Sequence, residues 1–262
     1  MNFNKQNYKL ILQTAINQGF EFVDFSTVNL EKYSGKQIIL RHDIDYSLEL
    51  AHEMAEIDAI YKIKSTFAVL ISSPLYNPFT YANIKIINGI HSLGHNIVLH
   101  YYRTSGQVKK DMVQDINRAF QFMKVYLPYI QPVFIFHNPS LFNSVSEIKV
   151  PKLINAYSNR FTKDMFYISD SVLRNTPEIL LGALVKQRLI HLLLHPLIWM
   201  SEQDNMTSMM SYVLTKIICE CDKEFAFNGK WREKYPHGIP QEFLERIQQI
   251  LNVRGISCSL DY

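Results

Sequence analysis

A pair of aspartates ends an apolar run near the start of the chain, in Ile38-Ile39-Leu40-Arg41-His42-Asp43-Ile44-Asp45. On a strand, side chains two residues apart share a face, so Arg41, Asp43 and Asp45 are expected to project together and His42 to project away. Two carboxylates at the end of a buried strand repel each other, and a metal ion, another cation or a shared proton commonly relieves the repulsion. The structural alternative is that the pair caps the next helix and pairs with Arg41.

Polar residues also follow four later strand-like segments. They are His100, His137, Asp170 and His195. Because the carboxyl ends of parallel strands meet at one edge of a sheet, we expect these side chains to gather with the aspartate pair. A lone histidine in such a place is more often a packed or capping residue. Three histidines and a carboxylate pair at matching strand ends instead favour a shared site.

The residue types at this edge suit a metal-assisted reaction. A carboxylate with imidazoles favours a borderline divalent ion such as zinc, with one position left for water. Such an ion polarises a carbonyl and acidifies water, while a second carboxylate takes a proton and a histidine protonates the leaving group. We assign Asp45 as a ligand, Asp43 as the base and His195 as the acid. This set predicts hydrolysis of an amide or an ester.

Alternating segments along the chain predict the elements that position these residues. Strands are expected at residues 37–42, 65–70, 96–100, 133–136, 166–169 and 190–194. Helices are expected at about 8–17, 48–61, 78–92, 108–127, 206–224 and 241–253. Near-continuous apolar strands separated by helix-sized intervals indicate a parallel sheet that is buried on both faces. We therefore predict an α/β protein, a (β/α) barrel or a distorted relative of one, with a single domain over 1–262.

Composition excludes several classes of protein. The 262 residues are 47% apolar and 19% charged, which excludes a disordered chain, and the net charge of +3 with scattered basic residues predicts no nucleic-acid partner. Three cysteines, Cys219, Cys221 and Cys258, are expected to be free thiols in a reducing compartment. The polar start of the chain predicts no signal peptide, and the apolar runs are too short to span a bilayer. We expect a cytoplasmic protein, with a peripheral membrane contact left open.

Three segments resemble the polysaccharide deacetylase family, the NodB-homology group that forms carbohydrate esterase family 4. They are residues 41–45, the segment 94–100 and Leu193-Leu194-His195-Pro196, and the resemblance spans about residues 38–199. It implies a distorted (β/α) barrel with a divalent metal, commonly zinc, that removes acetyl groups from sugars. It also implies Asp43 as the base, Asp45 and His100 as metal ligands and His195 as the acid. Asp170 falls near a later aspartate that orients catalytic groups.

The sequence departs from the family at one ligand. The second metal histidine of the family lies four residues after the first, and Thr104 stands there in this chain. Threonine is a poor zinc ligand. Either His137 or another group completes the site, or metal binding is weak, or catalysis has been lost. We place His137 as the third ligand.

Three functions remain open from the sequence. The first is a metal-dependent deacetylase of an amino sugar, a polysaccharide or a sugar-linked intermediate. The second is a non-catalytic carbohydrate-binding relative, and the third is an amidohydrolase of small nitrogenous substrates. For a carbohydrate substrate we expect contacts from Arg41, Asp170, Tyr101 and Trp199, with Tyr46 and Tyr102 as further aromatic residues near the mouth.

Overall fold

The computed structural model describes residues 2–30, 34–102, 109–139, 145–173 and 175–253. By its internal contacts the chain divides into two compact units, residues 1–204 and residues 205–262. The strands, and all the residues discussed above except Cys219, Cys221 and Cys258, belong to the first unit. The single domain expected over 1–262 stays a prediction, and the two units are described separately.

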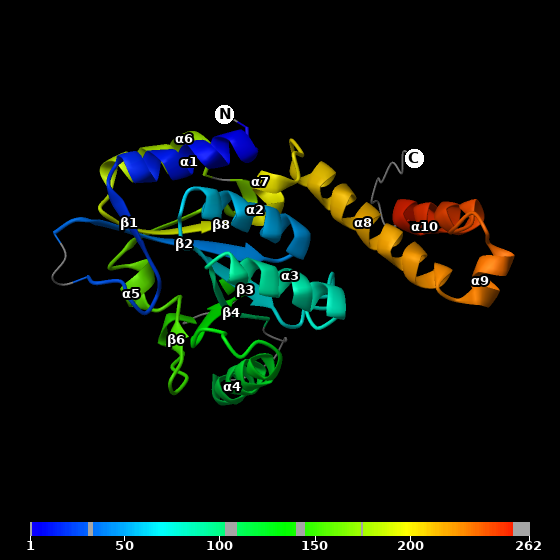
Figure 1. Ribbon diagram of the computed structural model, residues 1–262, viewed down its shortest axis with the longest axis horizontal. Coiled ribbons are helices and arrows are strands. Elements are labelled where there is room, and N and C mark those ends of the chain that lie inside the picture. Colours follow the sequence, from blue (N-terminus) through cyan, green and yellow to red (C-terminus); the bar gives the residue numbers. More distant parts are fainter. Residues whose placement is uncertain (1, 31–33, 103–108, 140–144, 174, 254–262) are drawn as a thin grey trace. The chain divides into compact units, whose positions relative to one another are not determined.

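The described strands form one eight-stranded sheet, and each of its pairs is parallel (Figure 1). The strand order is β6-β5-β4-β3-β2-β8-β7, with β1 beside the first half of β2. The strands are β1 (Phe20–Val23), β2 (Lys36–Ile44), β3 (Thr66–Leu70), β4 (Asn96–Tyr101), β5 (Val133–Phe136), β6 (Ile154–Asn155), β7 (Phe166–Ser169) and β8 (Leu189–Leu194).

This order is that of a (β/α) barrel with one seam left open. Strands β2 to β6 lie side by side in chain order, and β8 returns to the other edge of β2. Within the described residues β6 and β7 end the path without pairing with each other. The predicted distorted (β/α) barrel is confirmed as a curled parallel sheet that does not close. Every residue of β3, β4 and β5 is buried, as near-continuous apolar strands require.

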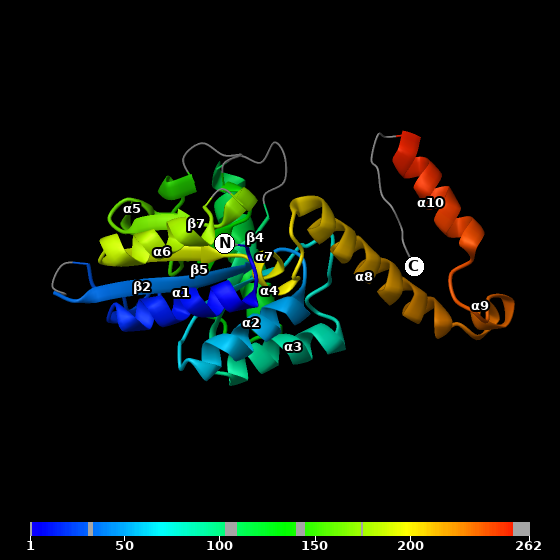
Figure 2. The ribbon, with the colours of Figure 1, turned by 90° about the horizontal axis from the view of Figure 1, so that it is seen from above.

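Helices surround the outside of the curled sheet (Figures 1 and 2). In the first unit they are α1 (Lys5–Asn17), α2 (Leu48–Ile60), α3 (Tyr81–Ser92), α4 (Lys109–Tyr126), α5 (Asn159–Thr162), α6 (Pro177–Lys186) and α7 (Pro196–Met200), with 3₁₀ turns η2 (Val145–Glu147) and η3 (Ser171–Leu173). Helix α1 packs against α6, and α2 packs against α3 and α7. Side chains of Asn4, Ser47 and Thr80 cap α1, α2 and α3 by accepting backbone N–H groups of the first turn.

The second unit holds three helices in its described part. They are α8 (Met206–Ala226), α9 (Gly229–Lys234) and α10 (Gln241–Val253). The ring of Trp231 packs against Phe225 at 4.8 Å and against Tyr235 at 4.6 Å between centroids, which joins α8 to α9. Cys219 and Cys221 are free and exposed, and Cys258 lies outside the described residues. Within the described ranges, no helix has both the length and the apolar character needed to cross a membrane.

Candidate metal centre

Three side chains from different strands meet at the carboxyl edge of the sheet. One ligand atom each from Asp45, His100 and His137 lies within 4.8 Å of the other two. His100 Nε2 lies 3.1 Å and His137 Nδ1 lies 3.3 Å from Asp45 Oδ1, and the two ring nitrogens are 3.3 Å apart. The structure therefore brings together the three residues that the sequence predicts as metal ligands.

The curl of the sheet is what brings His137 to Asp45. His137 follows β5 and Asp45 follows β2, with β4 and β3 between these strands. In a flat sheet the three intervals would separate them by about 14 Å. Their actual contact at 3.3 Å requires the sheet to bend around the cluster.

The donor set fits a divalent ion such as zinc. His100 Nδ1 lies 3.2 Å from the carbonyl oxygen of Ile135, so an N–H there leaves Nε2 as a bare lone pair facing Asp45 and His137. Two imidazole nitrogens that face each other at 3.3 Å need a proton or a cation between them. One carboxylate and two imidazoles are a common zinc set that leaves a position for water. His100 is fully buried, and Asp45 and His137 are partly exposed.

Asp43 is held by its neighbour on the same strand face. Arg41 Nε donates to Asp43 Oδ1 at 2.7 Å, and a second guanidinium nitrogen donates to Oδ2 at 2.5 Å. Burial alone would raise the pKa of Asp43, but the charges of Arg41 and His100 lower it below its usual value. Asp43 Oδ2 also lies 3.6 Å from His100 Nε2, so the carboxylate borders the cluster. The sequence left open that the aspartate pair only caps the next helix and pairs with Arg41. Arg41 does pair with Asp43, but the residue that caps α2 is Ser47.

His195 faces the cluster from the β8 side. Its Nε2 lies 3.7 Å from Asp45 Oδ2, and its Nδ1 lies 2.5 Å from Asp170 Oδ1. Asp170 Oδ2 accepts the backbone N–H of His195 at 2.9 Å and the indole N–H of Trp199 at 2.7 Å. Burial alone would lower the pKa of His195, but the charge and hydrogen bond of Asp170, with Asp45 and Asp43, raise it to about 9. His195 is therefore protonated at neutral pH and able to donate a proton from Nε2.

The predicted acid and the carboxylate pair share one narrow hollow. It is lined by Asp43, Ile44, Asp45, Tyr46, Ser47, His195, Pro196 and Leu197. Asp43, Asp45 and His195 therefore border the same small space, which has no room for a water molecule in this structure.

His42 projects away from the cluster, as the alternation of a strand predicts. It lies in a buried network on the helix side of the sheet, where its Nε2 is 2.9 Å from Asp58 Oδ2. Asp58 also accepts the hydroxyls of Tyr8 and Ser65, and the Ser65 backbone N–H donates to His95 Nδ1 at 3.2 Å. These side chains are all 1% exposed or less, so the network supports α1, α2, β2 and β3 and takes no part in chemistry.

The predicted substrate contacts need correction. Arg41, Asp170 and Trp199 are 0% exposed and Tyr101 is 2% exposed, so none of the four reaches the surface. The polar atoms are committed inside the protein: Arg41 to Asp43, Trp199 to Asp170, and the Tyr101 hydroxyl to Asp115 of α4 at 2.7 Å. Arg41 bonds Asp43, and Asp170 bonds both His195 and Trp199, so these buried side chains hold residues that border the cluster.

Three further residues contact the site, and only Tyr102 among them was named from the sequence, as an aromatic residue near the mouth. Tyr102 is 44% exposed and stacks on the His137 ring at 5.3 Å between centroids. The Tyr76 hydroxyl donates to the carbonyl of Ile44 at 2.6 Å and accepts the N–H of Leu70 at 3.0 Å, which fixes the strand end that carries Asp45. Asn138 lies 3.0 Å from His137 Nε2. Only Tyr102 carried a sequence signal, as an aromatic residue directly after a strand.

Thr104, which stands where the resemblance calls for a second histidine, lies outside the described residues. Among the described residues, the candidate ligand atoms come from Asp45, His100 and His137.

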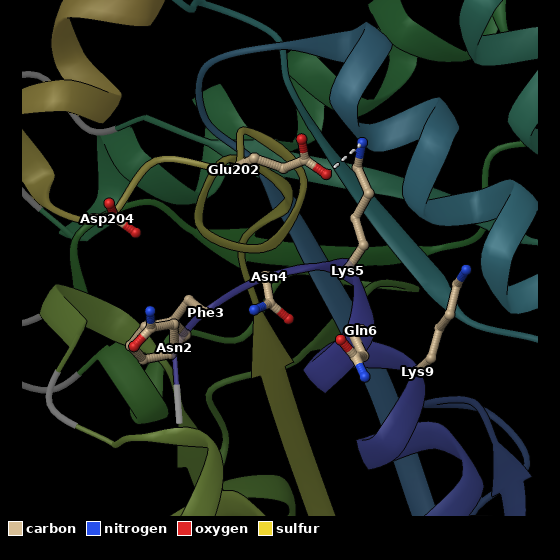
Figure 3. A pocket seen from close by; sticks show the side chains of 8 residues that line it. All are labelled: Asn2, Phe3, Asn4, Lys5, Gln6, Lys9, Glu202 and Asp204. Atoms are coloured by element: carbon tan, nitrogen blue, oxygen red, sulfur yellow. Dashed lines mark ion pairs between the residues drawn. The ribbon is translucent and has the colours of Figure 1, made fainter.

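A further hollow of the first unit is separate from the cluster. It has a volume of about 500 Å³ and lies at the start of α1, lined by Asn2, Phe3, Asn4, Lys5, Gln6, Lys9, Glu202 and Asp204 (Figure 3). Lys5 pairs there with Glu202 at 3.3 Å and with Glu53 at 2.7 Å. None of the residues that line it is a histidine.

The fold and the site together define a parallel α/β protein of the incomplete-barrel type with a candidate metal centre at its carboxyl edge. No family model matches the chain, and no curated protein matches its sequence. Among solved structures, the chain is similar to the wild-type CE4 family pseudoenzyme BA3943 from Bacillus anthracis, with 14% identity over 70% of this chain and 61% of that one and a TM-score of 0.45.

Two further structures are similar to a comparable degree. The Streptococcus pyogenes deacetylase PplD in complex with acetate is 14% identical over 69% of this chain and 87% of that one, with a TM-score of 0.46. A BA3943 mutant with restored enzymatic activity is 14% identical over 70% and 63%, with a TM-score of 0.45. The chain spans less than two thirds of the length of BA3943. At this identity the likeness concerns the fold alone.

Proposed function

We propose that this protein is a metal-dependent hydrolase that removes an acetyl or other acyl group from a sugar or a sugar-linked intermediate. The observation that carries the proposal is the convergence of Asp45, His100 and His137, with ligand atoms within 4.8 Å of one another. Asp43 borders this cluster, and His195 faces it from the β8 side. A carbohydrate substrate is favoured by the sequence resemblance.

The chemistry divides among these residues. A divalent ion held by Asp45, His100 and His137 would supply a Lewis acid for the acyl carbonyl and an acidified water. Asp43 accepts a proton as the water oxygen bonds to the acyl carbon. Its carboxylate cannot turn away, because two N–H groups of Arg41 hold both oxygens.

His195 completes the reaction on the other side. Its Nε2 proton passes to the nitrogen or oxygen of the sugar as the bond to the acyl carbon breaks. Asp170 keeps this imidazolium oriented through Nδ1 and keeps its pKa at about 9. The products are the free carboxylic acid and the deacylated sugar. Asp43 then gives its proton to solvent and His195 takes one from solvent, which restores both side chains.

Metal content and acid release test the proposal together. Purified protein that has been exposed to zinc and dialysed is expected to hold about one ion per chain. Asp45→Asn should lose the metal, because it removes the charged ligand. Asp43→Asn should keep the metal and lose acetate release from acetylated amino sugars. Asparagine is preferred to alanine there because it leaves a group for Arg41 to bond.

The control is His237→Gln, which changes an exposed histidine of the second unit and should alter neither readout. Wild-type protein that binds no zinc, or Asp45→Asn protein that releases acetate at the wild-type rate, would refute the proposal. Zinc binding without acetate release favours another acyl group or the amidohydrolase alternative.

A non-catalytic carbohydrate-binding relative of the same fold is the second candidate. It is favoured by Thr104 in place of the second family histidine. In that case zinc binding and its loss in Asp45→Asn persist, and acetylated carbohydrates bind without being hydrolysed.

A further inference from the structure

Asn138 has two unusual features beside the proposed metal centre. Its backbone has φ of 49°, in the left-handed region that asparagine tolerates better than most other residues with a side chain. Its side-chain amide lies 3.0 Å from His137 Nε2, the ring nitrogen that faces away from Asp45. The left-handed turn directly after His137 is what returns the amide onto that ring.

The hydrogen bonds of His137 depend on which ring nitrogen carries the proton. In the geometry described, Asn138 Nδ2 donates to Nε2, so the proton of a neutral ring is on Nδ1, 3.3 Å from the carboxylate of Asp45. To act as a ligand, Nδ1 must be bare, because it is the nitrogen that faces Asp45 and His100. The proton is then on Nε2 and needs an acceptor.

An asparagine amide serves both arrangements. It donates through Nδ2 when His137 Nε2 is bare, and it accepts through Oδ1 after a half-turn when Nε2 is protonated. Histidine ligands commonly donate the other ring N–H to such a partner, which fixes the tautomer and the ring orientation. Tyr102 stacks on the same ring, so the ring plane stays in place while the proton changes sides.

We propose that Asn138 is a positioning residue of the metal centre. Its side-chain amide rotates by a half-turn when a metal ion replaces the proton on His137 Nδ1. The inference rests on the proposed metal centre and assigns it a partner outside the ligand set.

Zinc affinity in a set of variants tests this role. Asn138→Gly keeps the left-handed backbone and removes the amide, and it is expected to weaken zinc binding about tenfold, the lower end of the range for such partners because Asn138 is exposed. Asn138→Asp keeps an acceptor for the Nε2 proton and is expected to bind zinc at least as tightly as the wild type. Affinity is measured by competition with a chromophoric chelator.

Lys62→Gly is the matched control, since Lys62 also has a positive φ, of 57°, and lies away from the site. It should leave the zinc affinity unchanged. Equal affinity in wild-type and Asn138→Gly protein would overturn the inference while leaving the proposed function standing. Loss of affinity in Asn138→Asp equal to that in Asn138→Gly would overturn it as well. Wild-type protein that binds no zinc would remove both proposals.

The position of the proton on the His137 ring gives a second readout, which does not depend on enzymatic activity. Long-range ¹H–¹⁵N spectra of histidine-labelled protein, with His137 assigned through His137→Gln, distinguish the two neutral tautomers. The expected result is a proton on Nδ1 without metal and on Nε2 with zinc in the wild type. The same tautomer in both states would show that the amide does not change its role.

Discussion

Asp170 and His195 form a short charged contact at the site, with 2.5 Å between Oδ1 and Nδ1. Asp170 is itself fixed, because Oδ2 accepts the backbone N–H of His195 and the indole N–H of Trp199. The two residues come from the neighbouring strand ends of β7 and β8. One buried carboxylate thus holds the side chain and the backbone of the same histidine, which leaves Nε2 as its only reactive atom.

Removing the charge of Asp170 should shift the alkaline limb of the pH–activity profile. In the wild type, activity should fall as pH rises above about 9, because His195 loses the proton it must donate. In Asp170→Asn, one amide oxygen serves the His195 and Trp199 N–H donors, and the amide NH₂ then faces Nδ1. This arrangement disfavours the imidazolium, so the limb should move down by about 1–2 pH units.

The measurement is kcat/KM for acetylated amino sugar across pH 6 to about 10, the range that brackets the ordinary and raised histidine pKa values. Asp164→Asn makes the same change at an exposed aspartate and should leave the limb in place. An unmoved limb in Asp170→Asn would mean that His195 is not the acid.

Removing one charge of the buried Arg41–Asp43 pair should destabilise the protein more than removing both charges. Both side chains are buried, at 0% and 4% exposure, so Arg41→Met leaves an uncompensated carboxylate. We expect Arg41→Met to lower the free energy of unfolding by about 3–5 kcal/mol. Arg41→Met with Asp43→Asn should recover part of that loss, since no buried charge is then left alone. The free energy of unfolding in urea is measured for both variants. A double variant that is no more stable than Arg41→Met would contradict the prediction.

The sequence predicted six of the eight described strands and the direction of their polar ends. The strands expected at 133–136 and 166–169 have those bounds as β5 and β7, and the other four match within one or two residues. The alternation of a strand correctly separated His42 from Asp43 and Asp45. These features are local consequences of apolar periodicity, which is why one sequence was enough to find them.

What the sequence could not predict depends on tertiary structure. Strands β1 and β6 and helix α6 were not predicted, and β6 has only two residues, too few for a periodic signal. The burial of Arg41, Asp170, Tyr101 and Trp199 follows from partners at distant positions, such as Asp115 for Tyr101. The contact between Asp45 and His137 depends on the curl of the sheet, which no local pattern encodes.

The buried network behind β2 should be sensitive to the loss of one hydroxyl. Tyr8 of α1 donates to Asp58 of α2, and Asp58 also bonds His42 of β2. Tyr8→Phe removes a hydrogen bond to a buried carboxylate and should cost about 1.5–3 kcal/mol of stability. Tyr61→Phe, which removes a hydroxyl bonded only at the surface to Gln13, is the control and should change little. Equal unfolding midpoints for the two variants would show that the hydrogen bond from Tyr8 to Asp58 does not stabilise the protein.

His191 should make the protein sensitive to mild acid. The side chain is 0% exposed, with Nδ1 3.1 Å from the carbonyl of Phe161, while Nε2 has no partner among the described residues. Burial, with the nearby charge of Arg41, lowers the pKa of His191 to about 3. The unfolded chain has an ordinary histidine pKa of about 6.5, so between these values the unfolded state binds the extra proton. Its contribution to stability is complete above about pH 6.5 and is lost as pH falls toward 3.

At pH 5 this linkage should cost the wild type about 2 kcal/mol relative to pH 7.5. His191→Phe keeps a ring among Phe25 and Tyr167 and cannot be protonated, so it should lack this part of the pH dependence. The free energy of unfolding in urea is measured for both metal-free proteins at the two pH values. All other titrating groups are shared by the two proteins, so the difference between their pH dependences belongs to His191. If both lose the same stability between pH 7.5 and 5, His191 is either already protonated or open to water in the folded protein.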